Sequence, residues 1–343
     1  MFRHHLTMPS HTKLRISPNL LRPTLRRFQR LRILVVGDLM LDEFIYGRVS
    51  RISPEAPVPV VHVEKESAYP GGAANVARNL ASLGIHAELS GGIGQDETGQ
   101  QLLQLLRHGK IGVSGICRSS KFPTTRKTRI LARQQQLVRV DREEPNRLTP
   151  KERDAVLRKA LQVLPRCDAM ILEDYGKGLF DQPFVDALLE AAHAKKIPTA
   201  IDPNIHNPLQ WNGATLVKPN RTEAFGALGQ ADSSNPKDWI AAGEELLLKW
   251  SCEHLLLTLG EHGMILFQPR QKPYAIPSRA REVYDVSGAG DTVVSLLAAG
   301  LGAGLRGDLS AEIANLGAGI VVGKLGTATV TPQEIIEASR NHG

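Results

Sequence analysis

Asp285-Val286-Ser287-Gly288-Ala289-Gly290-Asp291-Thr292 is followed directly by an apolar run from Val293 to Ala299. Three small residues before an acid and an apolar run predict a tight turn and then a helix that begins at Asp291. The N–H groups and the dipole of a helix N-terminus attract anions. The Asp291 carboxylate could take a proton from a hydroxyl while the N–H groups of Gly288, Ala289 and Gly290 stabilise a transferring phosphoryl group. An Asp that only caps a helix is the alternative.

The composition is that of a globular protein. Of 343 residues, 42% are hydrophobic and 22% are charged, as in ordinary folded domains. No apolar run approaches the roughly 20 residues that span a bilayer. The cysteines Cys117, Cys167 and Cys252 are odd in number and far apart. This spacing fits neither a disulfide framework nor a Cys-x-x-Cys metal site, so we expect a cytoplasmic protein.

The excess positive charge of the chain lies in its first 30 residues. Residues 1–30 contain seven Lys and Arg residues and no acid, which accounts for the whole formal net charge of +7. A basic arm can contact nucleic acid or anionic lipid, but this one lacks the apolar core of a secretory signal. We expect a flexible extension over 1–30, without a nucleic-acid or membrane partner, before a single domain over 31–343.

The rest of the chain alternates between strand and helix patterns. We predict strands over 32–38, 169–172, 198–202, 215–218 and 254–258, and a helix over 73–83. Such alternation is typical of an α/β fold with a mainly parallel sheet. Polar residues follow several of these strands, and the carboxyl ends of parallel strands are where open α/β sheets bind ligands.

Two segments, 44–63 and 124–141, show extended patterns without an intervening helix. Within the second, 124–131 and 136–141 resemble the arms of a hairpin that turns near Arg133-Gln134. We predict that these strands form a small second sheet that covers the site. A lid of this kind would exclude water from a phosphoryl donor.

Two patterns could contact a ligand. Gly71 and Gly72 precede the predicted helix that carries Asn75, and glycines permit close approach of a ligand while Asn both donates and accepts. Asp42 follows the first strand and could accept hydrogen bonds from sugar hydroxyls. A tight helix start and an ordinary loop acid are the alternatives.

Two further patterns indicate a metal–nucleotide site. Asn220 and Glu223 could hold hydrated Mg²⁺, which takes few carboxylates and keeps several waters. Thr258, Gly260 and Gly263 form a strand and turn that could lie against a polyphosphate. The alternatives are a simple helix N-terminus and a plain hairpin turn.

Residues 31–335 resemble the ribokinase-like (PfkB) family of carbohydrate kinases. The resemblance rests on the order and spacing of Gly71-Gly72/Asn75, Asn220/Glu223, Gly260/Gly263 and Gly288-Ala289-Gly290-Asp291. It implies a three-layer α/β/α fold with a mainly parallel central sheet and a small β-sheet lid. It also implies an ATP-dependent kinase.

Details of the sequence are similar to the heptose-7-phosphate kinase branch of that family. They are Val286 where the family has Thr, the segment 51–60 and the segment 173–178. The resemblance implies phosphorylation of the C1 hydroxyl of D-glycero-β-D-manno-heptose 7-phosphate to the 1,7-bisphosphate, in the ADP-heptose pathway for the lipopolysaccharide inner core. It suggests a kinase-only form, without the adenylyltransferase often fused to it. The alternatives are a phosphofructokinase- or ribokinase-type kinase and a non-catalytic sugar or nucleotide sensor.

The resemblance also implies residue roles. Asp291 would be the base, and Asn220 and Glu223 would hold Mg²⁺ through water. Further expected contacts are Asp42, Gly71, Gly72 and Asn75 for the sugar, Thr258, Gly260 and Gly263 for the ATP phosphates, Asn315, Ala318 and Gly319 for adenine, and Asp285 with the Ser287 carbonyl for a monovalent cation such as K⁺. A homodimer through the lid strands is expected too.

A substrate that carries a second phosphate needs cations away from ATP. The hairpin supplies Arg126, Lys127, Arg129, Arg133 and Arg139, and Lys177 lies in a Gly-x-Gly turn. Since alternate residues of a strand face opposite sides, Lys127 and Arg129 share one face and Arg126 takes the other. The pattern leaves open which face looks inward, and solvated cations on an exposed lid are the alternative.

Overall fold

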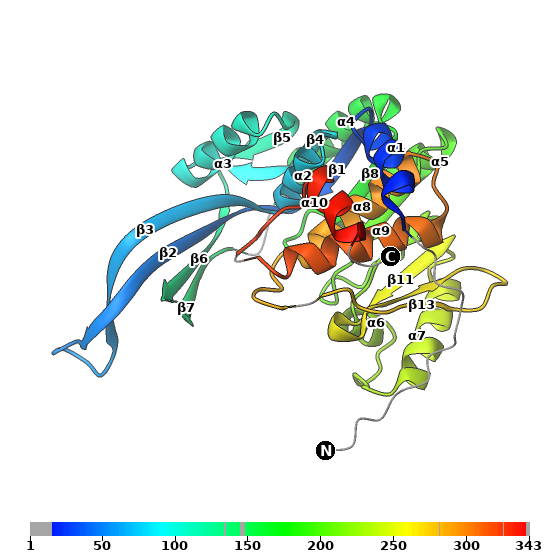
Figure 1. Cartoon of the computed structure of the whole chain (residues 1–343). Coiled ribbons are helices and arrows are strands. Elements are labelled where there is room, and N and C mark those ends of the chain that lie inside the picture. Colours follow the sequence, from blue (N-terminus) through cyan, green and yellow to red (C-terminus); the bar gives the residue numbers. More distant parts are fainter. Residues whose placement is uncertain (1–15, 134, 145–147, 281, 325, 341–343) are drawn as a thin grey trace, which may run out of the picture.

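Two β-sheets organise the protein (Figure 1). The computed structural model describes residues 16–133, 135–144, 148–280, 282–324 and 326–340. The nine strands of the larger sheet lie in the order β13 (Tyr274–Ile276), β12 (Met264–Phe267), β11 (His254–Thr258), β10 (Leu216–Val217), β9 (Thr199–Asp202), β8 (Ala169–Glu173), β1 (Arg32–Gly37), β4 (His86–Gly94) and β5 (Gly112–Ser119). Neighbours from β11 to β5 are parallel, and β12 and β13 are antiparallel. The predicted α/β class with a mainly parallel sheet is confirmed.

Helices cover both faces of this sheet. On β1, Ile33 and Val35 enter one buried apolar cluster, whereas Leu34 and Val36 enter the other. The first cluster includes residues of α1 (Pro18–Phe28), α2 (Ala73–Ser82), α3 (Glu97–His108), α8 (Ala289–Gly302), α9 (Gly307–Val321) and α10 (Pro332–Arg340). The second includes residues of α4 (Pro150–Val163), η1 (Leu164–Arg166), α5 (Gln182–Ala194), α6 (Arg221–Ala227) and α7 (Pro236–Lys249). The continuous apolar run of β1 is therefore buried on both sides, as in other α/β folds.

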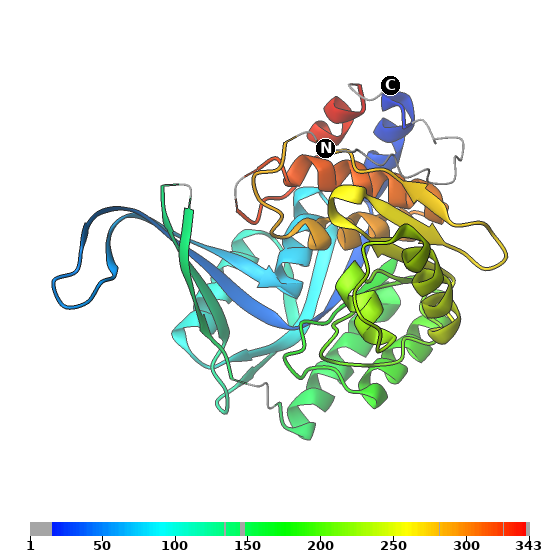
Figure 2. The same ribbon diagram turned by 90° about the horizontal axis from the view of Figure 1, so that it is seen from below.

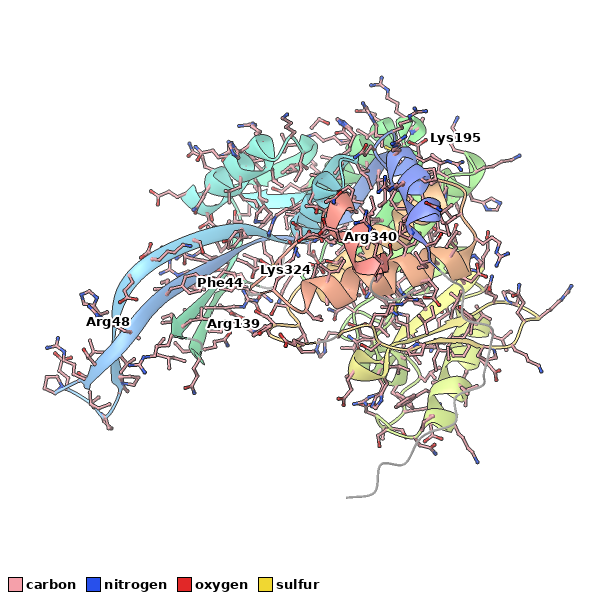
Figure 3. The ribbon with its side chains drawn as sticks, viewed as in Figure 1. Phe44, Arg48, Arg139, Lys195, Lys324 and Arg340 are labelled. Atoms are coloured by element: carbon pink, nitrogen blue, oxygen red, sulfur yellow. The ribbon has the colours of Figure 1, made fainter. Side chains whose placement is uncertain are left out.

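The second sheet is the predicted lid, in the order β3 (Pro59–Gly72), β2 (Leu39–Ile52), β6 (Thr125–Ala132) and β7 (Gln135–Arg142). It extends away from the body of the protein (Figure 2), and Phe44, Arg48 and Arg139 lie along it (Figure 3). Strands β2 and β3 are longer than the predicted segment 44–63 because they continue into the body as far as Leu39 and Gly72. Residue Gln134 of the predicted turn lies outside the described residues.

The N-terminal segment differs from the predicted flexible extension. Residues Pro18–Phe28 form α1, which begins after Ser17 and packs on α10. Leu21, Leu25 and Phe28 are fully buried, while the arginines point outward. Their spacing of four and three residues makes one apolar stripe on a helix, a signal that the charge count of this segment concealed. Residues 1–15 of the predicted extension lie outside the described part.

The three cysteines are free thiols. Burial raises the pKa of Cys167 and of Cys252 to about 12, so both thiols stay protonated and unreactive at neutral pH. Among the described residues, no helix has both the length and the apolar character needed to cross a bilayer.

The packing of α1 predicts that it stabilises the domain. Phe28→Ala removes a fully buried ring and should lower the free energy of unfolding by about 3–5 kcal/mol. Arg26→Ala, on the exposed face of the same helix, should change it by less than about 0.5 kcal/mol. Denaturant unfolding followed by circular dichroism measures both values. Equal midpoints for the two variants would show that α1 does not contribute to the core.

Candidate active site

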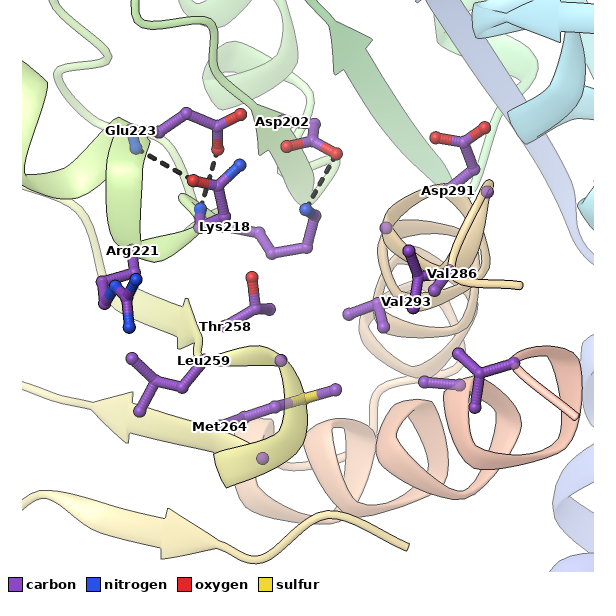
Figure 4. Close-up of a pocket in the computed structure, with 18 of the residues that line it drawn as sticks. Asp202, Lys218, Arg221, Glu223, Thr258, Leu259, Met264, Val286, Asp291 and Val293 are labelled. Carbon is purple, nitrogen blue, oxygen red and sulfur yellow. Dashed lines mark hydrogen bonds and ion pairs between the residues drawn. The ribbon is translucent and has the colours of Figure 1, made fainter. Parts of the chain in front are cut away.

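A cavity of about 940 Å³ lies at the carboxyl ends of strands β8 to β11 (Figure 4). This is the edge of the sheet at which the sequence predicted ligand binding. Most of the predicted catalytic and nucleotide residues line it: Gly288, Ala289, Gly290, Asp291, Asn220, Glu223, Thr258, Gly260, Gly263, Asn315, Ala318 and Gly319. A cavity of this size is in the range of small-molecule sites in proteins.

The predicted anion turn lies at one side of this cavity. Helix α8 begins at Ala289, two residues before the predicted start, so Asp291 stands in its first turn. Gly288 has a φ of +79°, and a Cβ there would lie 3.0 Å from the Asn75 Nδ2 atom. A side chain at this position would strain the backbone and crowd the Asn75 amide. The Ala289 N–H donates to the Val286 carbonyl oxygen at 3.2 Å, so this predicted phosphoryl contact is already engaged within the turn.

Asp291 is buried and held by two donors. The Asn75 side-chain amide donates to Asp291 Oδ2 at 2.5 Å, and the Tyr175 hydroxyl donates to Asp291 Oδ1 at 3.0 Å. Burial raises the pKa of Asp291 to about 6, and the two hydrogen bonds oppose that rise. A carboxylate with a pKa near the operating pH is suited to act as a general base.

The predicted sugar residues lie on the other side of Asp291, where the lid joins the body. A Cβ on Gly71 would lie 2.3 Å from Asp42 Oδ2, and one on Gly72 would lie 2.6 Å from the Asp38 carbonyl oxygen. These glycines thus permit the close packing of β3 on β2, and Gly72 is also the N-cap of α2, in keeping with the tight helix start that was the alternative. Asp42 is buried, and its Oδ1 accepts from Arg129 at 2.5 Å.

The register of the lid resolves which cations face the site. Asp42 pairs with Lys127 across β2 and β6, and Phe44 pairs with Arg129, so both cations share the face of Asp42. Arg126 pairs with Leu41 and points to the opposite face, so the register does not support its prediction as a substrate contact.

The other predicted cations are placed differently. Arg133 lies exposed in the turn after β6, and its role as a substrate contact stays a prediction. Arg139 pairs with Arg129 across β6 and β7 and so shares the face of Asp42, but it is exposed and its guanidinium binds Asp141. Lys177 is partly buried and pairs with Glu143 at 2.8 Å. Burial lowers the pKa of Lys127, and the positive charge of Lys177 lowers it further. Glu143, which pairs with Lys177, and Asp141 act on the pKa of Lys127 in the opposite direction.

Asn220 and Glu223 form the start of α6. The Glu223 N–H donates to Asn220 Oδ1 at 2.9 Å, and the Asn220 N–H donates to Glu223 Oε2 at 2.7 Å. This is a capping box, the helix-terminus reading left open above. The same two residues line the cavity. Burial and the charge of Asp202 raise the pKa of Glu223 to about 7. The role of this pair in holding Mg²⁺ stays a prediction.

Three important charges were missed by the sequence analysis. Glu173 and Asp202, at the ends of β8 and β9, lie with Asp291 so that one oxygen of each is within 4.8 Å of the others. Lys218 is almost completely buried, and its Nζ lies 2.8 Å from Asp202 Oδ2 (Figure 4). Its positive charge partly neutralises these three acids. Burial raises the pKa of Glu173, and its buried Oε2 has no hydrogen-bond partner among the described residues. The sequence signal for Glu173, Asp202 and Lys218 as site residues was their position at the ends of strands.

Arg78 and Tyr175 also contact the site and were not predicted. Arg78 donates to Asn75 Oδ1 at 3.3 Å and to the Thr327 carbonyl at 2.7 Å, and its guanidinium covers the Tyr69 ring. It lies three residues after Asn75, a helical spacing that places both on one face. The sequence signal for Tyr175 as a site residue was its position shortly after the end of a strand.

The residues predicted to contact the nucleotide also have roles in the fold. Gly260 and Gly263 bound the 3-10 turn η2 (Gly260–His262) between the antiparallel strands β11 and β12. A Cβ on Gly263 would lie 2.1 Å from the Ile276 carbonyl oxygen, so β13 requires this glycine. The Asn315 amide donates to the Pro277 carbonyl at 2.8 Å. This segment therefore forms the hairpin turn that was the alternative, and the turn lies on the wall of the cavity.

The predicted monovalent-cation residues form a compact turn. Asp285 Oδ1 accepts from the Ser287 N–H at 2.9 Å, and Oδ2 accepts from the Gly326 N–H at 3.2 Å. Both carboxylate oxygens are thus engaged with the backbone. The role of Asp285 and Ser287 in holding a cation stays a prediction.

Residues 30–334 match the pfkB family of carbohydrate kinases. The chain belongs to this family. The match covers the central sheet, the lid and the cavity. The predicted family membership is confirmed, and Asp291 lies within the matched region.

Curated relatives in the family include two bifunctional HldE proteins. The protein of Vibrio vulnificus strain CMCP6 is 44% identical over 318 residues, and that of Aeromonas hydrophila subsp. hydrophila is 45% identical over 315 residues. The alignments cover 93% and 92% of this chain, and 65% of each relative. The chain therefore spans slightly less than two thirds of the length of the relatives it matches.

Solved pfkB-like structures share the fold. Phosphofructokinase-2 from Escherichia coli, in complex with potassium, superposes with a TM-score of 0.73 at 18% identity, over 91% of this chain and 99% of that one. Ribokinase from Arabidopsis thaliana, complexed with ribose and ATP, gives 0.70 at 16% identity, over 90% and 99%. These likenesses confirm the ribokinase-like architecture.

The raised pKa of Asp291 predicts a pH dependence of catalysis. The charged carboxylate is the active form of a base, and it predominates above its pKa of about 6. We therefore expect kcat/KM to be constant above about pH 7 and to fall about tenfold per unit well below pH 6. Asn75→Ala removes a hydrogen bond that lowers this pKa, so its acidic limb should move to higher pH. Steady-state rates from pH 5 to 9 test this, and a flat profile down to pH 5 would exclude Asp291 as the titrating base.

Proposed function

We propose that this protein is an ATP-dependent kinase that phosphorylates the C1 hydroxyl of D-glycero-β-D-manno-heptose 7-phosphate to the 1,7-bisphosphate. The product enters the ADP-heptose pathway for the lipopolysaccharide inner core. The observation that carries the proposal is the buried Asp291, which lines the cavity and is bonded to Asn75 in the helix that directly follows lid strand β3. Lys127 and Arg129 share the lid face of Asp42. The similarity to HldE proteins over most of this chain supports the choice of sugar.

In this mechanism Asp291 removes the proton from the C1 hydroxyl as its oxygen attacks the γ-phosphorus of ATP. The new O–P bond forms while the bond to the β-phosphate oxygen breaks, and ADP leaves. The first turn of α8 and the turn before it stabilise the charge on the transferring group. The burial of Asp291 limits the access of water to the base itself.

The carboxylates beside Lys218 fit a divalent cation. Several acids share one lysine, and the buried Glu173 Oε2 lacks a hydrogen-bond partner among the described residues. Glu223 and Asp202, with Asn220 at the cavity wall, would hold hydrated Mg²⁺. When bound, Mg²⁺ neutralises charge on the ATP phosphates. A monovalent cation such as K⁺, held near Asp285 and the Ser287 carbonyl, belongs to the same proposal.

Lys127, Lys177 and Arg129 are proposed to bind the 7-phosphate. Lys127 and Arg129 share the face of Asp42, and Lys177 acts electrostatically on Lys127. Fixed cations on the lid, in addition to the groups that hold ATP, would let the enzyme discriminate a sugar phosphate from neutral sugars. Arginine can add bidentate phosphate contacts.

We also propose a homodimer through the lid strands and a cytoplasmic location. Val138 and Val140 are exposed on the lid face opposite Asp42, and Ile52 is exposed at the far end of β2. Apolar residues on exposed strands favour pairing with another copy. The three free thiols are in keeping with a reducing compartment.

The identity of the substrate is tested by ADP release with Mg-ATP over heptose 7-phosphate, sedoheptulose 7-phosphate, fructose 6-phosphate, ribose and fructose. We expect turnover with heptose 7-phosphate and a loss of about 10²–10⁴ in Asp291→Asn, since the base is removed. Asp186→Asn, on the exposed side of α5, is the matched control and should keep full activity. Preference for a neutral sugar would refute the proposed substrate. ATP binding without turnover of any sugar would favour a sensor.

The two faces of the lid provide an internal comparison. Lys127→Ala and Lys177→Ala should each raise KM for the sugar phosphate about 10- to 100-fold, the value of a hydrogen bond to a charged group. KM for ATP should stay within about twofold. Arg126→Ala, on the opposite face of the same strand, should leave both constants unchanged. If all three variants behave alike, the phosphate does not bind on the Asp42 face.

A further inference from the structure

The Asp291 carboxylate is clamped at both of its oxygens. Asn75 occupies Oδ2 and the Tyr175 hydroxyl occupies Oδ1. Asn75 comes from the first turn of α2, whereas Tyr175 follows β8 in the segment Asp174–Gly178. Donors on opposite oxygens fix the rotation of the carboxylate about its Cβ–Cγ bond. Each oxygen keeps a second lone pair with which to accept the proton of a substrate hydroxyl.

The segment that carries Tyr175 is itself held rigidly. The buried Asp38 accepts from the N–H groups of Tyr175 and Lys177 through Oδ2, at 3.0 Å each. Asp174 accepts from the Gly176 N–H at 2.7 Å and from the Asn207 amide at 2.9 Å. Gly176, with a φ of +66°, allows the chain to turn between them. These bonds fix the backbone on both sides of Tyr175, so its hydroxyl has a defined position.

The Tyr175 hydroxyl remains a donor over the working pH range. Burial raises the pKa of Tyr175, and the negative charge of Asp291 raises it further. Among the described residues, Tyr175 is the side chain that donates to Asp291 Oδ1. A phenylalanine in its place would keep the ring and leave that oxygen without this donor.

We propose that Tyr175 is a positioning residue for the base: its hydroxyl, fixed through the Asp38-anchored segment, orients the Asp291 carboxylate toward the acceptor hydroxyl. The inference rests on the proposed function, because it takes Asp291 as the base of a sugar kinase. A misoriented base slows proton transfer in the transition state and leaves ground-state binding intact. The effect should therefore appear in kcat and not in KM.

The test is a double-mutant cycle of Tyr175→Phe with Asp291→Asn, assayed with Mg-ATP and heptose 7-phosphate. We express kcat per ATP-binding site, measured by titration, so that any loss of folded protein cancels. Tyr175→Phe should lower kcat roughly 10- to 100-fold, as expected for a hydrogen bond to a charged group. KM for either substrate should change by less than about twofold. In the Asp291→Asn background, the same substitution should change the residual rate by less than about threefold.

Tyr284→Phe is the matched control. Tyr284 is exposed, and its hydroxyl bonds to Glu282 at 3.0 Å. This variant should retain full kcat. An unchanged kcat in Tyr175→Phe, or an equal loss in both backgrounds, would overturn the positioning role and leave the proposed function intact. A wild-type protein that phosphorylates none of the sugars would instead refute the proposed function, and the inference with it.

Discussion

The active site depends on the hydrogen bond between Asn75 and Asp291. It joins the first turns of α2 and α8, which are 216 residues apart in the chain. The bond is possible because Gly288 leaves room for the Asn75 amide. It also opposes the effect of burial on the Asp291 pKa, since a donor stabilises the charged carboxylate. Asp291 therefore lies on the wall of the cavity and is bonded to the helix that directly follows lid strand β3.

Burial and charge are balanced around that acid. Glu173, Asp202 and Glu223 crowd the same edge of the sheet, and Lys218 lies among them. Each unpaired carboxylate in a buried site is costly, which is why burial raises the pKa of all three. Such a site is poised to accept cationic charge together with a polyphosphate. Perturbed pKa values of this kind cluster at functional sites.

In the lid, the register of the strands decides which cations share the face of Asp42. Lys127 and Arg126 are neighbours in sequence, yet β6 turns one toward Asp42 and the other away. A shift of one residue in the pairing of β2 and β6 would exchange them. The lid also continues into the body through Gly71 and Gly72, whose missing side chains let β3 pack against Asp42 and Asp38. The sugar side of the site is thus fixed by the close packing of two strands.

The sequence by itself determined the layered α/β fold, because the apolar run in β1 and the alternation of strand and helix are local patterns. It also determined the helix start at the small residues before Asp291. It did not reveal α1, whose apolar stripe lies within a basic segment. The contacts of Tyr175, Lys218 and Arg78 were decided only by the tertiary structure. Tyr175 meets Asp291 across 116 residues, and such contacts depend on strand order and register, which no local pattern contains.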